Sequence, residues 1–292
     1  MKRIALKIDA DTYHGTLAGV PALIGLLRRH EAQGTFFFSL GRDQSGTEAG
    51  QCSLRRYYNL TTRLYGRLLP GPDIGTHCAD ILRQTNSAGF EVGIHNMNRV
   101  KWEQKIHKAD NLWVETEINK ACARFLEVFS TGPKAHAAAG WKMNRHALRL
   151  TQRLGFSYAS DCRGTHPFIP VIDGEIVACP QLPTTLPTLD EVLAQDAGLT
   201  PEQAADRIIE CSIDTAGDHV FTLRAELEGM KFTAAFDHLL AAWKRQGCTL
   251  VSLRDIHASL NLKGLPRHTV EFREIPGRPG LRMAQGPVFL AE

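Results

Sequence analysis

The feature that most constrains the fold is the alternation of short apolar segments with segments of helical period. Strands are expected near residues 3–9, 34–40, 91–95, 134–139, 157–161, 176–180, 219–225 and 248–252. Between them, apolar residues recur at helical spacing as Val114, Ile118, Cys122, Phe125 and Phe129, and again as Phe232, Phe236, Leu239 and Trp243. We interpret these stripes as core. The alternation predicts an α/β fold with parallel strands joined by crossover helices.

Polar side chains follow five of the expected strands, at the point where each strand ends. They are Asp9 and Asp11, His95, Trp141 and Lys142, Asp161 and Arg163, and Arg224 and Glu226. In a parallel α/β barrel all carboxyl ends of strands share one rim, and enzymes with this architecture assemble their active sites there. The pattern therefore predicts a site at the rim of a (β/α) barrel.

Asp9 and Asp11 stand two residues apart at the end of the apolar run 4–8. Side chains alternate across a strand, so the two carboxylates point to the same side. Two carboxylates that share a site repel each other unless a cation or a shared proton relieves them, which suits a divalent metal or general-base chemistry. An Asx turn or a helix cap is the structural alternative for this motif.

Composition narrows the function classes. The 292 residues, 43% hydrophobic and 22% charged, suffice for one large α/β domain or two small ones. A formal net charge of +3 without a basic block argues against a nucleic-acid partner. Seven cysteines without a C-x-x-C pair indicate reduced thiols and a cytoplasmic location. With neither a signal-peptide core nor a bilayer-spanning apolar run, we expect a soluble or peripheral protein.

Two segments interrupt the alternation. Residues 42–75 form a long insertion after the second strand, in which Arg55, Arg56, Arg63 and Arg67 are mixed with tyrosines and leucines. Such a segment suits an anionic membrane surface, or else a solvated helix packed over the barrel rim. The tail 265–292 reads as a hairpin without evident chemistry. We expect a domain over 1–260 that includes the insertion, and an extension over 261–292 packed on it.

Six segments in order along the chain carry a resemblance to a known family. They are Ile8-Asp9-Ala-Asp11-Thr12, Val92-Gly-Ile-His95, Ala137-Ala-Ala-Gly-Trp141, Ser160-Asp161-Cys-Arg163-Gly164, Leu182-Pro-Thr-Thr-Leu-Pro-Thr188 and Ala225-Glu226-Leu-Glu228-Gly229. The chain resembles, over about residues 3–255, the polysaccharide deacetylase family (carbohydrate esterase family 4). The Asp-Cys-Arg-Gly and Leu-Pro-Thr elements make it most similar to the 4-deoxy-4-formamido-L-arabinose-phosphoundecaprenol deformylase branch.

The resemblance implies a distorted (β/α) barrel that hydrolyses an amide with a water bound to a divalent metal such as zinc. Asp9 would be the general base, and Asp11 and His95 metal ligands. Asp161 and Arg163 would be the pair that orients the base. In the sugar pocket, Trp141 would form a wall, and Glu226, Glu228 and Arg99 would bind substrate. The substrate would carry formyl or acetyl on an amino sugar linked to a polyprenyl phosphate, which suits a peripheral location on the inner face of the membrane.

Two positions depart from the family pattern. Arg99 stands where the second metal-binding histidine is expected, and Arg224 where the histidine that protonates the leaving nitrogen is expected. Guanidinium has no free lone pair for a metal and is a very poor acid, although it can stabilise an oxyanion. One hypothesis is that an arginine pairs with Asp9 or Asp11 and replaces the cation. The other is a rebuilt metal site in which His14 or His77 supplies the missing imidazole.

These departures leave three functions open at the sequence level. The first is an amide hydrolase of the family with an atypical metal site. The second is a catalytically silent sugar-binding or lipid-binding homologue, because Arg99 and Arg224 remove two chemical functions. The third is a metal-independent enzyme whose arginines hold a phosphate or carboxylate of the substrate.

Overall fold

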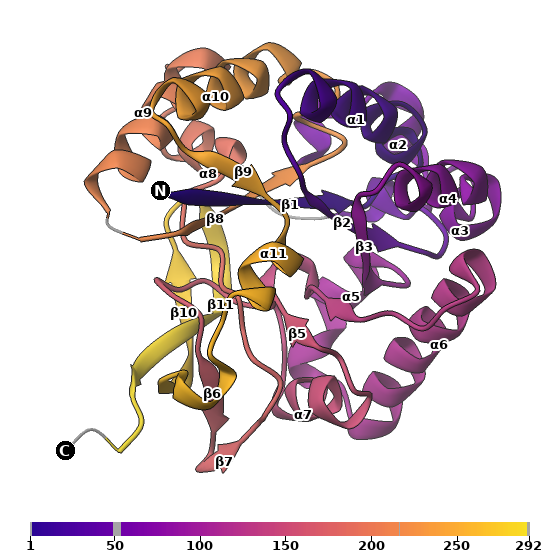
Figure 1. The fold of residues 1–292 in the computed structure, drawn as a ribbon. Coiled ribbons are helices and arrows are strands. Elements are labelled where there is room, and N and C mark those ends of the chain that lie inside the picture. Colours follow the sequence, from indigo (N-terminus) through magenta and orange to yellow (C-terminus); the bar gives the residue numbers. More distant parts are fainter. Residues whose placement is uncertain (1, 49–53, 216, 291–292) are drawn as a thin grey trace.

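A curled parallel sheet forms the centre of the molecule (Figure 1). The computed structural model describes residues 2–48, 54–215 and 217–290, and within them the sheet has seven strands in the order β5-β4-β3-β2-β1-β8, with β9 also paired to β1. The strands are β1 Arg3–Ala10, β2 Thr35–Ser39, β3 Glu91–Asn96, β4 Ala135–His136, β5 Tyr158–Ala159, β8 His219–Arg224 and β9 Thr249–Val251. All their pairings are parallel, as predicted.

An irregular segment, 181–186, fills the gap between the edge strands β5 and β8. The N–H of Leu182 donates to the carbonyl of Ala159 at 2.8 Å, and the N–H of Thr185 donates to that of Val220 at 3.0 Å. The strand predicted at 176–180 is wrong except at its first residue, because the N–H of Ala178 donates to the Gln152 side chain at 2.6 Å and Pro180 has no N–H to donate. This seam bends the sheet into the distorted (β/α) barrel that the sequence predicted.

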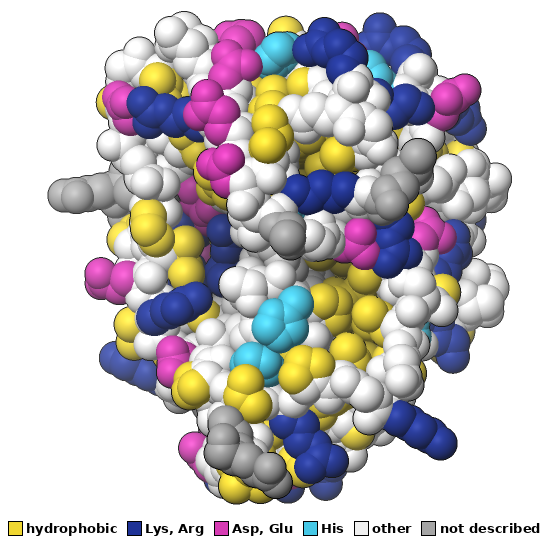
Figure 2. Space-filling view, turned by 60° about the vertical axis from the view of Figure 1, so that its left-hand side comes forward, with side chains coloured by type: hydrophobic (Ala, Val, Ile, Leu, Met, Phe, Trp, Pro, Cys, Tyr) yellow, Lys and Arg dark blue, Asp and Glu magenta, His cyan; other side chains and the backbone are white. Residues whose placement is uncertain are grey.

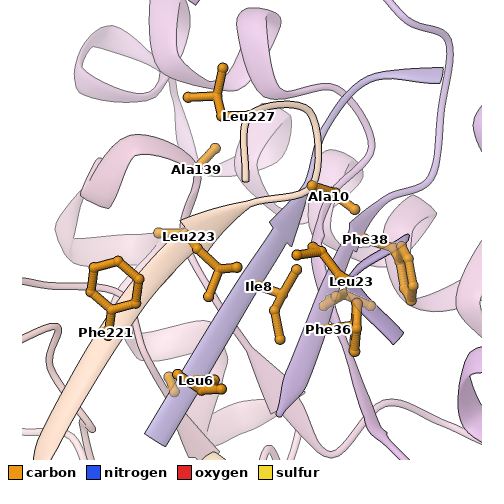
Figure 3. Packing of buried hydrophobic residues seen from close by; sticks show 14 of the residues in the cluster. Leu6, Ile8, Ala10, Leu23, Phe36, Phe38, Ala139, Phe221, Leu223 and Leu227 are labelled. Carbon is orange, nitrogen blue, oxygen red and sulfur yellow. The ribbon is translucent and has the colours of Figure 1, made fainter. Parts of the chain in front are cut away.

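Alternation along β1 separates two layers of side chains. Leu6, Ile8 and Ala10 lie on the face toward Leu23 of α1 (Val20–Arg29), where Figure 3 shows them packed beside the aromatic residues of β2. The intervening Lys7 and Asp9 therefore point to the barrel interior. The apolar layer holds the sheet against its helices, while the opposite layer supplies polar groups to the rim.

Helices surround the sheet (Figure 1). Besides α1 they are α2 Leu60–Leu64, α3 Ile74–His77, α4 Ala79–Ser87, α5 Arg99–Lys105, α6 Asn111–Phe129, α7 Arg145–Arg153, α8 Leu189–Gln195, α9 Pro201–Asp214, α10 Thr233–Arg245 and α11 Leu253–Ala258. The two predicted stripes lie on α6 and on α10 with the residue before it, and they pack in the core as expected. The side chain of Asp110 caps α6 by accepting the N–H of Trp113.

A second sheet has the order β11-β10-β6-β7 and lies below the barrel in the view of Figure 1. It contains β6 Ile169–Ile172, β7 Glu175–Ile176, β10 Arg267–Ile275 and β11 Arg278–Val288. The antiparallel β10 and β11 form the hairpin that was predicted for the tail 265–292, and β10 also pairs with β6 in parallel. The hairpin is tied to the barrel at Arg163, whose N–H donates to the carbonyl of Met283 at 3.0 Å.

The surface carries charges of both signs. Figure 2 shows basic and acidic side chains interspersed over one face, with hydrophobic side chains gathered in a hollow near its middle. Among the described residues, no helix is both long and apolar enough to cross a bilayer.

Candidate active site

The barrel rim brings together four of the side chains that the sequence singled out. Asp9 from β1, His95 from β3 and Arg224 from β8 meet at Asp11, which follows β1 directly. The Oδ1 atom of Asp11 lies 3.5 Å from Nε2 of His95, and its Oδ2 atom lies 3.0 Å from Nη1 of Arg224. Asp9, Asp11 and His95 are only 2%, 4% and 1% exposed. The site is therefore a buried charge cluster.

Lys7 lies beneath this cluster and was not among the predicted site residues. Its Nζ is 3.1 Å from Oδ1 of Asp9 and 5.6 Å from the ring centroid of Trp141. Burial lowers the pKa of Lys7, although Asp9 opposes the shift. Burial alone would raise the pKa of Asp9, but the charges of Lys7, His95 and Arg224 hold it below its ordinary value. Spacing could have indicated Lys7, since it precedes Asp9 by two residues on one strand.

Arg99 reaches the same cluster from the start of α5. Its guanidinium is 2.6 Å from Oε2 of Glu48 and 3.0 Å from Oε1 of Glu103, and it donates to the Tyr58 hydroxyl at 3.3 Å. Its Nε stands 3.7 Å from Oδ2 of Asp11. The predicted pairing of an arginine with Asp11 is confirmed, mainly through Arg224. Arg224 makes this contact through one nitrogen, Nη1, whereas the terminal nitrogens of Arg99 face Glu48 and Glu103.

The donor set at Asp11 does not fit a divalent metal ion. One carboxylate oxygen accepts a hydrogen bond from Ser39 at 2.6 Å, and the other faces the two guanidinium groups. His95 has no hydrogen-bond partner on either ring nitrogen, but a third donor is missing because position 99 carries an arginine. Within the described ranges, no group of three or more His, Cys, Asp or Glu is placed to hold a metal ion.

The two histidines considered as replacement ligands do not take that role. Nδ1 of His14 contacts Oγ1 of Thr62 at 2.9 Å, and its ring stacks on Tyr65. His77 contacts the carbonyl of Asp73 at 2.9 Å on the exposed surface. The short helices of the insertion provide these partners, a tertiary arrangement that spacing in the sequence could not reveal.

The expected pair of Asp161 and Arg163 is not formed in the described structure. Asp161 contacts Nδ1 of His136 at 2.7 Å and accepts the N–H of Ala138 at 2.8 Å. The guanidinium of Arg163 lies 3.4 Å from Glu191 instead. Asp161 therefore positions β4 and the loop after it, and the sequence reasoning missed His136. Positions 161 and 163 would point to the same side of a regular strand, but the chain bends at Cys162, so the two side chains diverge.

Trp141 is buried beside the cluster and is covered by the C-terminal hairpin, and its role as a wall of a sugar pocket stays a prediction. Arg163 and Arg278 lie over its ring at 5.1 and 4.9 Å from the centroid. Arg278, at the start of β11, also lies 2.7 Å from both Asp190 and Glu191. The tail was expected to have no evident chemistry, yet it brings the largely enclosed guanidinium of Arg278 to the edge of the site.

Glu226 and Glu228 follow β8 and bind backbone groups of the cluster. Glu226 accepts the N–H of Asp11 at 3.4 Å, and Glu228 accepts the N–H of Arg224 at 2.8 Å. Burial, reinforced by the charge of Asp11, raises the pKa of Glu226 to about 8. Burial and the charge of Asp190 raise the pKa of Glu228 to about 8, although the hydrogen bond from the Arg224 N–H opposes this shift. Both carboxyls are enclosed, so their role in substrate binding stays a prediction.

In this conformation the cluster is closed to solvent. The crevice beside Asp11, which Ser39, Arg42 and Asn98 also line, has no room for a water molecule. Glu48 and Tyr58 of the insertion bind Arg99, which lines this crevice. Residues that line the crevice would have to move for a substrate to reach Asp11.

Curated proteins similar to this chain share nearly its whole length. A probable 4-deoxy-4-formamido-L-arabinose-phosphoundecaprenol deformylase of Shewanella sediminis is 31% identical, over 95% of this chain and 93% of that protein. A protein of the same name from Wigglesworthia glossinidia brevipalpis is 28% identical, over 91% of this chain and 96% of that protein. No family model matches the chain.

Solved structures share the fold. A crystal structure named as a polysaccharide deacetylase of Mycobacterium smegmatis superposes with a TM-score of 0.66 at 18% identity, over 94% of this chain and 96% of that one. At this identity the likeness concerns architecture alone, whereas the Shewanella relative matches in sequence across both chains. The chain therefore belongs to the 4-deoxy-4-formamido-L-arabinose-phosphoundecaprenol deformylase family, with the polysaccharide deacetylase fold.

Proposed function

We propose that this chain hydrolyses the N-formyl group of an amino sugar carried on a polyprenyl phosphate. The observation that carries the proposal is the near full-length similarity to relatives named for that deformylation, together with the acidic cluster at the barrel rim. The same similarity favours a hydrolase over the catalytically silent homologue that Arg99 and Arg224 had suggested. The guanidinium groups make the site atypical.

The chemistry can be assigned to residues of the cluster. The carboxylate of Asp9 is buried and is kept ionised by the charges of Lys7, His95 and Arg224, so it can accept a proton from an attacking water. The water oxygen bonds to the formyl carbon, and the N–H groups of Arg224 stabilise the oxyanion that forms. As the carbon–nitrogen bond breaks, Asp9 returns the proton to the leaving nitrogen, which yields formate and an amine. Arginine does not transfer the proton, because its pKa is too high.

The insertion provides a surface suited to the lipid carrier. Leu60 and Leu68 are each 74% exposed, and the nearby Arg56 and Arg67 are exposed as well. Exposed leucines flanked by arginines favour adsorption to an anionic bilayer. We propose that this edge of 54–69 rests on the membrane and presents the sugar to the rim.

The catalytic proposal is tested by measuring formate released from a polyprenyl-phosphate-linked formamido sugar. Wild-type protein is expected to release formate, and Asp9→Asn to lose at least about 100-fold in rate, the scale of a general base. Asp73→Asn, at a half-buried helix cap near the end of the insertion, serves as the control and keeps its rate. A wild type that releases no formate, or an Asp9→Asn protein as fast as wild type, would contradict the proposal.

Flotation with vesicles that contain anionic phospholipid tests the membrane surface. Replacement of Leu60 and Leu68 by serine is expected to reduce the bound fraction, because apolar insertion is lost. The matched control is Leu126→Ser on α6, where the leucine is 52% exposed. Equal flotation of all three proteins would refute the proposed orientation.

A further inference from the structure

Two histidines outside the candidate active site face each other through the same ring atom. Nε2 of His166, in the loop before β6, lies 3.1 Å from Nε2 of His268 on β10. The rings are 4.9 Å apart at their centroids and nearly perpendicular, at 71°. The pair belongs to the junction between the loop 163–168 and the C-terminal hairpin, and the deformylation chemistry does not use it.

Hydrogen bonding assigns the protons of His268. Its Nδ1 lies 2.8 Å from the carbonyl of Gly286, which only accepts, so Nδ1 carries the hydrogen. In the neutral ring, Nε2 of His268 then presents a lone pair to His166. The carbonyl contact also fixes the orientation of the ring, as partners of metal-binding histidines do.

When both rings are neutral, Nε2 of His166 cannot form good hydrogen bonds with both of its neighbours, Nε2 of His268 and the Gln285 amide. Oε1 of Gln285 accepts the Thr165 N–H at 2.8 Å, which orients the amide so that its NH2 group faces Nε2 of His166 at 3.1 Å. If this Nε2 is unprotonated, two lone pairs oppose each other across the histidine pair. If it carries the hydrogen, two donors oppose each other at Gln285. A cation between the rings removes the first conflict by binding both lone pairs, and the Gln285 NH2 group then gives up its contact with Nε2 of His166.

We propose that His166 and His268 together bind one divalent transition-metal ion, such as zinc or nickel, through their Nε2 atoms. Zinc–nitrogen bonds of about 2.05 Å to both atoms would give an angle near 100° at the ion for this separation, between octahedral and tetrahedral geometry. Water completes the coordination, because no acidic or cysteine side chain of the described residues joins the pair.

The setting suits a site that loads from solvent. His268 is buried on a strand paired with β6 and β11, whereas His166 is exposed. Pro167 and the Thr165 contacts restrain the loop, so little order is lost on binding. Metal held here would link the C-terminal hairpin to the barrel loop that carries Arg163.

Isothermal titration of the full chain, purified without a histidine tag, with NiCl2 or ZnCl2 tests the proposal. One ion per chain is expected at neutral pH, with affinity reduced at least about tenfold in His166→Gln and in His268→Gln. His77→Gln removes an exposed imidazole elsewhere and is expected to bind as wild type does. Thermal unfolding should shift upward with nickel in wild type and not in His166→Gln.

Binding that survives both substitutions, or the absence of binding to wild type, would overturn the assignment. His166→Gln decides the question if His268→Gln fails to fold, because the His166 side chain is exposed. The outcome is independent of the deformylase proposal, since the readout is metal affinity rather than formate.

Discussion

Replacing Glu228 by glutamine should stabilise the protein at neutral pH. The carboxyl is 1% exposed, and burial raises its pKa from 4.5 to about 8. The pKa of Glu228 is higher in the native state than in the unfolded chain, so the protonated carboxyl favours the native state. This contribution to stability is complete below about pH 4.5 and is lost as the pH rises toward 8. Glutamine keeps an oxygen for the Arg224 N–H but cannot ionise.

The magnitude follows from the width of that window. Each pH unit between the two pKa values costs the wild-type native state about 1.4 kcal/mol, so the cost between pH 5 and pH 7 is about 3 kcal/mol. Glu228→Gln should be close to wild type at pH 5 and more stable by up to that amount at pH 7. If the new amide destabilises the native state by a constant amount, the free energy of unfolding of the variant falls equally at pH 5 and at pH 7. The quantity to compare is therefore the slope of the free energy of unfolding against pH in the two proteins.

Urea denaturation at a series of pH values measures this slope. Glu210→Gln on α9 changes an exposed glutamate and should follow the wild-type curve within about 0.5 kcal/mol. Parallel curves for wild type and Glu228→Gln would refute the reasoning, because they would mean that Glu228 ionises equally easily in both states. Glu226, whose pKa is also raised, contributes to both proteins and cancels.

Three further variants test an ion pair, the missing metal ligands and the packing of the site. Arg278→Met should lower the free energy of unfolding by about 3 kcal/mol in urea, because it removes the cation 2.7 Å from buried Asp190 and one of the two guanidinium groups beside buried Glu191. The exposed Arg273→Met on the same hairpin should change it by less than about 0.5 kcal/mol, and equal effects would contradict this. The double change Arg99→His and Arg224→His should add one bound Zn2+ per chain in calorimetry, and an unchanged stoichiometry would show that the donor geometry is not restored. Trp141→Ala should cost about 4 kcal/mol, because it removes a fully buried ring, and a loss below 1 kcal/mol would indicate that the wall is loosely packed.

Much of the rim could be predicted because it follows from local periodicity. Asp9 and His95 sit at the ends of strongly apolar strands, where alternation decides which face a side chain occupies. Lys7 obeys the same rule and was overlooked because lysine is seldom buried. The partners of Asp161 and Arg163 could not be predicted, since they come from segments distant in the sequence.

The chain's sequence by itself determined the parallel α/β barrel, the convergence of the acidic and basic side chains at one rim, and the loss of imidazole at positions 99 and 224. The positions of the strands along the chain and the parity of their side chains need only the spacing of apolar residues and the chemistry of each residue type. Only the tertiary structure decided that Arg224 and Arg99 face Asp11, that the hairpin carries Arg278 onto Trp141, and that His166 meets His268. These contacts join segments far apart in the chain, and their geometry depends on how loops and strands pack in space.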